Sequence, residues 1–450
     1  MKKKQLRWTL WTIASPFILF IILCILIYLP PIQNFLVDKA AVYASEATGM
    51  NISVGRISLS FPLNLVVTDV DAASPHKDTL LSVRRLQVNV QLLPLLKKQV
   101  EVDGISLQGA TVNSNDLIHG MKLNGTLGEL FISSHGVALD PETAIVNKVL
   151  LKDTDLSLCL NDTAAADTAA SDTTYWKIIL QDIDLQNVSF ALDMPLDSLS
   201  LAASLDNAIL RDGLIDLHKS AYSLQTFRIK NGRVRYDSGR PSATASADSL
   251  SAGLDPSHIA LTDIGVKLDS LYYEGRNMKA IISQFVLKER SGVEIVSTEG
   301  RLVSNDKVLR VPSLKLETRD SYLELNAAMD WDALDFKKEG LVSARLMADI
   351  GKPDVVRFMG SMDEKFIRKY PSEPLRIRTG IDGDLNKLKL TTLTAELPGA
   401  LELFAKGELT SLTDSLLRGG DITLQAETKD LKFISTLAEG IEIPYGTRLE

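Results

Sequence analysis

From Asn51 onward the chain alternates apolar and polar residues, and this pattern restricts its possible folds more than any other feature. The alternation runs through ISVGRISLS, LNLVVTDV, LSVRRLQVNV, VEVDGISLQG and LRIRTGIDG, with Gly, Asp, Asn and Pro between the runs. Successive side chains of a β-strand point to opposite faces of its sheet, so each run predicts a strand with one apolar and one polar face. The sequence therefore predicts a chain dominated by β-structure.

A short motif, apolar-x-apolar-x-(Gly/Asp/Asn)-x-x-apolar, recurs within these runs. Its copies begin at Ile105, Val149, Ile183, Phe227 and Ile259, with a weaker copy at Leu65. In the copy FRIKNGRVRY, residues 227–236, the pair Asn231-Gly232 is typical of a two-residue hairpin turn. Folding about that turn leaves one face wholly apolar and gives the other face four cations: Arg228, Lys230, Arg233 and Arg235. The same rule predicts a one-sided hairpin at each copy.

The apolar faces of these hairpins are the candidate functional surface. Burying one such side chain stabilises a protein by about 1.5–3 kcal/mol, so the face must be covered by something. A second sheet, a stacked β-solenoid and an open trough that holds an apolar ligand all satisfy this requirement, and alternation does not choose among them. The residues predicted to line the face are Leu107, Val112, Leu151, Leu156, Leu185, Phe190, Phe227, Ile229, Val234, Tyr236, Leu261 and Val266.

The N-terminus predicts a membrane anchor. Residues 8–29 carry no charge, and at ~1.5 Å per residue a helix of this length crosses a bilayer core. The run is longer than the apolar part of a signal peptide, and no clear small-x-small cleavage site follows it. A basic tail at residues 1–7 predicts a cytoplasmic N-terminus, which places the rest of the chain across the membrane. The residues expected to set this anchor are Lys2, Lys3, Lys4, Arg7, Trp8, Trp11, Pro16 and Tyr28.

Beyond the anchor, the periodicity divides the chain into segments. Residues 33–48 predict an amphipathic helix near the membrane, and residues 50–160 a first β region. Residues 161–174, NDTAAADTAASDTT, predict a flexible loop because they contain few apolar side chains. Residues 175–450 continue the β array, with short helices expected near 353–370 and 430–439.

Composition and motifs argue against several functions. A net charge of −8 and an aromatic content of 6% disfavour general binding of nucleic acid. The sequence has no metal-ligand spacing, phosphate-binding loop or nucleophile motif, and its two cysteines, Cys24 and Cys159, cannot form a disulfide framework. We therefore expect no enzymatic activity, no metal and no cofactor.

In combination and order, several pieces of the first 112 residues resemble the opening of the AsmA-like and TamB-like periplasmic proteins. These pieces are the membrane span, Gly49 before VGRI (residues 54–57), LVVTDVD (65–71), Lys97-Lys98 after LLPLL, and VDGISL (102–107) before Gly109. The resemblance implies an inner-membrane anchor that carries an elongated, curled antiparallel sheet, or β-taco, through the periplasm. Its apolar groove would carry phospholipid between the inner and outer membranes and support outer-membrane biogenesis.

The resemblance also implies an alternative function. TamB-like proteins, which form a translocation and assembly module, are linked to outer-membrane protein assembly with an Omp85-type partner. An apolar groove suits an alternating polypeptide strand as well as an acyl chain. The chain is then a scaffold or chaperone-like factor, and the sequence does not separate this function from lipid transport.

Overall fold

The computed structural model describes residues 49–60, 64–74, 79–91, 102–114, 120–138, 142–161, 175–239, 253–334, 340–359, 364–412 and 418–429, and the single positions 39, 41, 42, 45, 46 and 338. The predicted membrane span at 8–29, nearly all of the predicted loop at 161–174 and the predicted helix at 430–439 lie outside these residues. In the segment 33–48, the five described positions are helical. Among the helices that are described, none has the length and apolar character needed to span a membrane.

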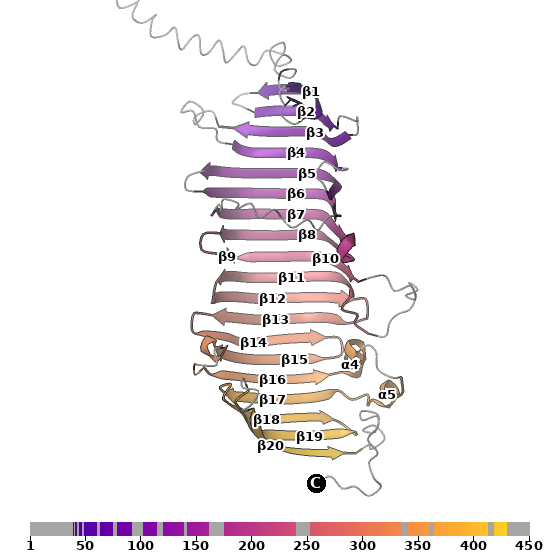
Figure 1. Ribbon diagram of the computed structural model, residues 1–450, viewed down its shortest axis with the longest axis vertical. Helices are drawn as coiled ribbons and strands as arrows, with labels where there is room; N and C mark the ends of the chain where they lie inside the picture. The colour runs from indigo at the N-terminus through magenta and orange to yellow at the C-terminus, as the bar shows by residue number, and fades with distance from the viewer. Residues whose placement is uncertain are drawn as a thin grey trace, which may run out of the picture. The chain divides into compact units, whose positions relative to one another are not determined.

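The described chain is all-β, as predicted, and it divides into two compact units (Figure 1). The first unit consists of residues 1–174 and 178–196. Its strands are β1 (Asn51–Ser60), β2 (Asn64–Ala73), β3 (Thr79–Val90), β4 (Val102–Asn113), β5 (Met121–Ala138), β6 (Thr143–Leu160) and β7 (Lys177–Met194). Strand β7, which follows the loop segment, thus belongs to the first unit.

The second unit consists of residues 175–177 and 197–450. Its strands are β8 (Leu199–Asp216), β9 (Ala221–Leu224), β10 (Thr226–Ser238), β11 (His258–Glu274), β12 (Asn277–Glu289), β13 (Glu294–Ser304), β14 (Val308–Thr318), β15 (Tyr322–Asp330), β16 (Val342–Ile350), β17 (Leu375–Gly383), β18 (Lys387–Leu397), β19 (Leu401–Thr410) and β20 (Gly419–Thr428). The short helices are η1 (Pro195–Asp197), η2 (Trp331–Leu334), α4 (Lys352–Met359) and α5 (Glu364–Lys369). Helices α4 and α5 lie where the sequence predicted short helices near 353–370.

Within each unit the strands pair with antiparallel neighbours, as expected for a simple meander. In the first unit β1 to β6 pair in chain order, and β7 is joined to β6 by a 2.9 Å hydrogen bond from Asn187 Nδ2 to Asp153 Oδ1. In the second unit β8 and β11 each pair with both β9 and β10, so these two segments occupy one place in the sheet. From β11 to β20 the pairing again follows the chain.

The predicted hairpins are wrong. Residues 227–236 lie within the single strand β10, which pairs with β8 on one side and β11 on the other. A two-residue hairpin needs positive φ at both central residues, but in β10 only Asn231 (φ 52°) is left-handed and Gly232 is not. A single left-handed residue produces a β-bulge, in which the strand kinks and continues.

All six copies of the motif are bulges of this kind. The residue at the fifth position of each copy has positive φ: Asp69 (54°), Gly109 (63°), Asp153 (48°), Asn187 (52°), Asn231 (52°) and Asp263 (53°). Gly, Asn and Asp are the residues that adopt this conformation at the least energetic cost. The motif therefore encodes a bulge within a long strand.

The units contain few large, fully buried side chains. Among the described residues, the only buried hydrophobic cluster consists of Tyr370, Leu397 and Ala400, with Val355, Leu375 and Leu401 packed against it. The cluster lies beside α4, at one end of strands β17 to β19. No second sheet covers the apolar face of either unit within the described residues, which disfavours the sandwich arrangement.

Candidate functional site: an apolar sheet face

The cross-strand register places apolar residues of successive strands side by side in the second unit. Phe227 of β10 lies opposite Leu210 of β8 and Leu268 of β11. Ile229 lies opposite Val266, which in turn lies opposite Phe285 of β12. Opposed residues share a face of a sheet, so these side chains form one continuous apolar surface.

The same face continues along the later strands of the second unit. Leu325 of β15 lies between Leu314 of β14 and Leu346 of β16. Ala344 of β16 lies opposite Ile381 of β17. On the remaining strands, the face continues through Leu390, Leu393, Ala395, Leu403, Ala405, Ile422 and Leu424.

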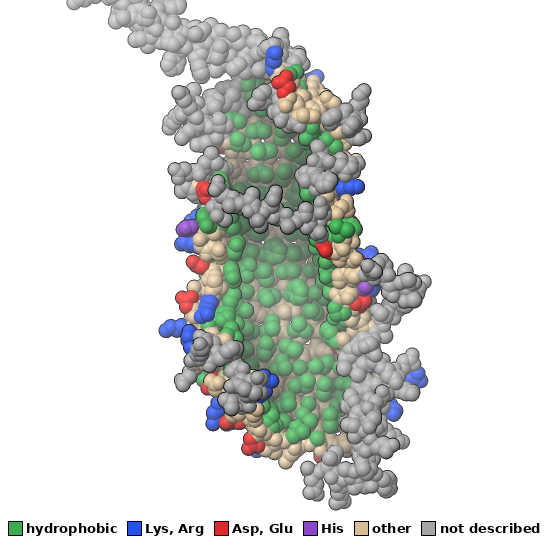
Figure 2. Space-filling model, viewed as in Figure 1, with side chains coloured by type: hydrophobic (Ala, Val, Ile, Leu, Met, Phe, Trp, Pro, Cys, Tyr) green, Lys and Arg blue, Asp and Glu red, His purple; other side chains and the backbone are tan. Residues whose placement is uncertain are grey.

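This face is hollowed and remains accessible to solvent. Figure 2 shows hydrophobic side chains lining a hollow over the second unit, with charged side chains along its margins. Phe227, Ile229, Val234 and Tyr236 are half-buried, whereas Arg228, Lys230, Arg233 and Arg235 of the same strand are exposed. We call the half-buried surface of the second unit the apolar groove, and the opposite surface of its sheet the outer face.

The first unit carries an equivalent apolar face. Leu130 of β5 lies between Leu107 of β4 and Leu151 of β6. Gly125 similarly lies between Val112 and Leu156. These pairings replace the predicted contacts of Leu107 with Val112 and of Leu151 with Leu156, which belonged to the hairpin interpretation.

Strand β7 presents its predicted residues in the same way. Ser189 donates a hydrogen bond to Asp155 of the polar face, so Phe190, the next residue, points to the apolar side. The bulge at Asn187 keeps Leu185 on that side, as the bulge at Asn231 does for Ile229. Phe190 is 38% exposed, which is a high value for a phenylalanine.

All twelve predicted lining residues thus lie on the apolar face of their own unit. This follows because a bulge, like the predicted hairpin, returns the residue three positions after the turn residue to the face of the residue two positions before it. The prediction omitted the later strands, β12 to β19, where plain alternation such as SLKLE and YLELN was the available signal. The bulge motif drew attention to the first half of the chain.

The outer face of the second unit is charged, and over β16 to β19 its charges are matched. Arg378 Nη2 of β17 lies 2.8 Å from Asp349 Oδ1 of β16, and Arg376 Nη1 lies 3.5 Å from Glu396 Oε2 of β18. Lys387 Nζ lies 3.1 Å from Glu408 Oε1 of β19. These exposed pairs each contribute at most about 1 kcal/mol, but they keep the outer face hydrated.

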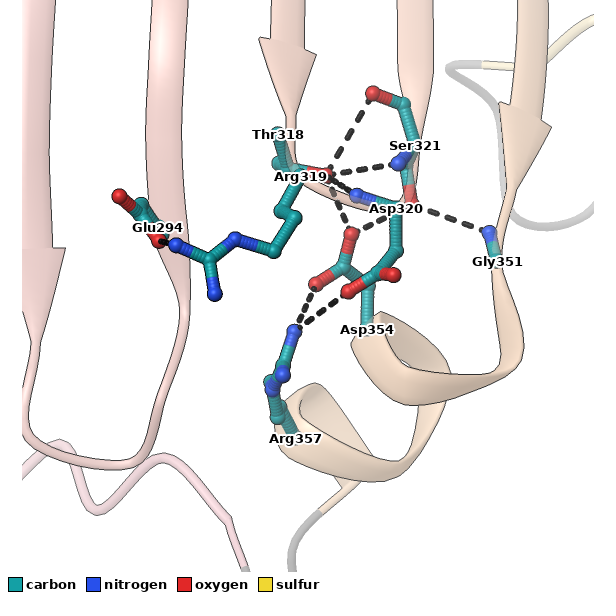
Figure 3. A network of polar contacts seen from close by, with 8 residues as sticks. All are labelled: Glu294, Thr318, Arg319, Asp320, Ser321, Gly351, Asp354 and Arg357. Carbon is teal, nitrogen blue, oxygen red and sulfur yellow. Dashed lines mark hydrogen bonds and ion pairs between the residues drawn. The ribbon is translucent and has the colours of Figure 1, made fainter.

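One end of the apolar groove is closed by α4, and a polar network holds this helix in place (Figure 3). The carboxylate of Asp354, in the first turn of α4, is 1% exposed. It accepts hydrogen bonds from Thr318 Oγ1, from Ser321 Oγ at 2.6 Å and from Arg357 Nη1 at 3.0 Å. A buried carboxylate needs such partners, because leaving one unpaired costs several kcal/mol.

The same network ties α4 to the turn between β14 and β15. Arg357 Nη1 also lies 2.9 Å from Asp320 Oδ2, and Gly351 N donates to Ser321 Oγ at 3.0 Å. Burial by itself would lower the pKa of Arg357, but its hydrogen bonds to Asp320 and Asp354 outweigh this and raise the pKa. Sequence analysis missed this network, for which scattered Ser, Thr and Asp at strand ends were the only signal.

The described residues contain no group of His, Cys, Asp or Glu side chains that could hold a metal ion. The surface features that remain are the apolar faces themselves and the charges around them. The comparison with known proteins adds no assignment: no protein-family model matches the chain, and no curated protein matches its sequence.

Proposed function

We propose that the protein carries phospholipid along its apolar groove, and that it does so as an inner-membrane-anchored protein of the periplasm. The observation that supports this proposal is the continuous row of half-buried apolar side chains from β10 to β19. Water contact at such a surface is unfavourable, and an acyl chain that covers it gains about 0.8 kcal/mol for each methylene removed from water.

The character of the groove favours a fluid ligand. Its surface is built from Leu, Ile, Val and Ala on many strands, which contact a chain through dispersion and the hydrophobic effect without fixing its position. A ligand that must move along the sheet needs this uniformity. The anchor at 8–29 and the periplasmic location belong to the same proposal, and they rest on the sequence.

The proposal is tested by position-specific photo-crosslinking of the full chain in a double-membrane bacterium grown with radioactive phosphate. A crosslinking amino acid replaces Ile229 or Leu325 in the groove, or Asn326 on the outer face. Leu325 and Asn326 are adjacent on β15, so the two sites differ in the face they present. We expect labelled phospholipid on the groove positions and little on Asn326.

Charge insertion provides the functional test. Leu325→Asp places a carboxylate in the groove, whereas Asn326→Asp places one on the outer face, opposite Arg345. We expect the first variant to lose most of its crosslinked lipid, measured at Ile229, and the second to keep it. Equal labelling of both faces, or undiminished lipid in folded Leu325→Asp protein, would contradict the proposal. Crosslinks to polypeptide in place of lipid would favour the scaffold function with an Omp85-type partner.

A further inference from the structure

We propose that the outer face of β10 is a docking surface for an extended acidic segment of a partner protein. The surface consists of the four cations of β10 and one cation of β11, and we call it the cationic strip: Arg228, Lys230, Arg233, Arg235 and Lys267. Lipid carriage in the apolar groove does not use these side chains, because they point away from the groove.

The register gives the strip few acidic neighbours. Arg228 lies between Ile209 of β8 and Lys267 of β11, so it is flanked by an apolar residue and a like charge. Lys230 lies opposite Asn207, and Arg235 lies between Ala202 and Ala260. Like charges directly opposite each other destabilise a sheet, so this arrangement works against folding.

Acidic side chains reach only part of the strip. Arg235 Nε lies 2.7 Å from Asp237 Oδ2, Arg233 Nη2 lies 3.7 Å from Asp206 Oδ1, and Lys267 Nζ lies 3.9 Å from Asp269 Oδ1. Within the part of the chain that the structure describes, Arg228 and Lys230 form no ion pair. Both are exposed.

The outer face of β17 shows that the same sheet can match its charges. Its cations Arg376 and Arg378 are also two residues apart, and each has an acidic partner on a neighbouring strand, Glu396 and Asp349 respectively. Arg228 and Lys230 have the same spacing without such partners. An external anion would supply what the neighbouring strands of β10 lack.

The spacing of the strip favours an acidic peptide as that anion. Cations at alternate positions of a strand are ~7 Å apart, and so are carboxylates at alternate positions of an extended peptide. Asp206, Asp237 and Asp269 lie among the cations and would repel a uniformly anionic membrane surface. The aromatic residues of β10, Phe227 and Tyr236, lie on the opposite face, so the strip offers no ring for stacking nucleic acid bases.

The experiment measures binding of a fluorescent peptide of about eight residues, long enough to span the strip, in which Glu alternates with Ser. The full chain is solubilised in a neutral detergent, and binding is followed by fluorescence anisotropy. We expect the Glu peptide to bind, a Gln counterpart not to bind, and the affinity to fall as salt is added. The double variant Arg228→Gln/Lys230→Gln should weaken binding by roughly tenfold, as expected for the loss of two exposed ion pairs.

The matched control is Arg376→Gln/Arg378→Gln, which removes two cations of the same spacing from β17. It should leave peptide binding unchanged. Equal loss in both double variants, or no preference for the Glu peptide, would overturn the proposal. So would binding of oligothymidine, or of vesicles made from equal parts of phosphatidylglycerol and phosphatidylcholine, with the same dependence on Arg228 and Lys230. Thermal unfolding monitors the fold, and removing Arg228 should not lower the unfolding temperature, because its nearest charged neighbour is Lys267.

Discussion

Two parts of the apolar groove differ in what covers them. Beside α4, Tyr370, Leu397 and Ala400 are 7%, 4% and 1% exposed, and together they form a closed core. On β10 and β11, Phe227, Ile229, Val234 and Leu261 are only half-buried, although they lie on the same face of the sheet. Covering a sheet face thus requires an additional element, and in the second unit α4 supplies it over one end.

The closed end is specified by polar contacts and the open part by alternation. Helix α4 is held by a buried carboxylate whose partners come from the turn between β14 and β15. The open part needs only strands whose apolar residues fall on one side. A region that depends on one buried charge is sensitive to single substitutions, whereas a region built from many equivalent apolar contacts is tolerant of them.

The largest expected effect follows from Asp354→Ala. The substitution leaves the hydroxyl groups of Thr318 and Ser321 and the guanidinium of Arg357 without their shared partner. We expect a loss of about 3–5 kcal/mol in the local stability of the α4 region, typical of breaking a buried ion pair. Hydrogen exchange of the amides in residues 351–370 measures it.

The control for this prediction is Asp332→Ala, because Asp332 forms an exposed ion pair with Lys338. That pair should contribute less than about 1 kcal/mol. Similar exchange rates in the two variants would mean that Asp354 does not hold the helix.

Leucine truncation compares the two regions directly. Leu397→Ala opens a cavity in the closed core and should lower the free energy of unfolding by about 2–5 kcal/mol. Leu261→Ala should have a smaller effect, about 1 kcal/mol, because part of the Leu261 side chain already contacts solvent. Urea unfolding measures both. Equal losses would show that Leu261 is covered as completely as Leu397.

The bulge of β10 tests how the open part keeps its face. Asn231 has φ 52°, a conformation that a β-branched residue adopts at a cost of about 1–2 kcal/mol. Asn231→Val should therefore destabilise the second unit by about that amount, whereas Asn231→Gly should be nearly neutral, apart from the lost hydrogen bond to Asp206. Thermal unfolding of the pair distinguishes them, and an equally stable Val variant would argue against the left-handed bulge.

The smallest effect concerns pH at the end of β12, near the open part of the groove. Burial by itself would raise the pKa of Glu289, but hydrogen bonds from Ser291, Ala260 and Arg290 outweigh it and lower the pKa. A lowered folded-state pKa stabilises the fold above the unfolded-state pKa, and this stability is lost as pH falls through the folded value. Glu289→Gln should remove that part of the acid sensitivity. An unchanged pH profile of unfolding would contradict the assignment.

The sequence by itself determined that the chain is all-β and which side chains share a face. Alternation is a local property, because neighbouring side chains of a strand must point to opposite sides whatever the strand pairs with. Ile229 and Val234 share a face whether Asn231 begins a hairpin or forms a bulge. The assignment of apolar residues to one face therefore did not depend on the turn being correct.

Only the tertiary structure decided what each strand pairs with and what closes the groove. Asn231-Gly232 is compatible with a reversal and with a bulge, and the outcome depends on whether one or both residues become left-handed. Pairing of β10 with β8 and β11 over its whole length favours one. The contacts of Asp354 with Thr318 and Ser321 join residues 36 and 33 positions apart, and no local pattern encodes such a distance. Pairing and closure depend on long-range contacts, whereas the two-sided character of a strand depends only on its own backbone.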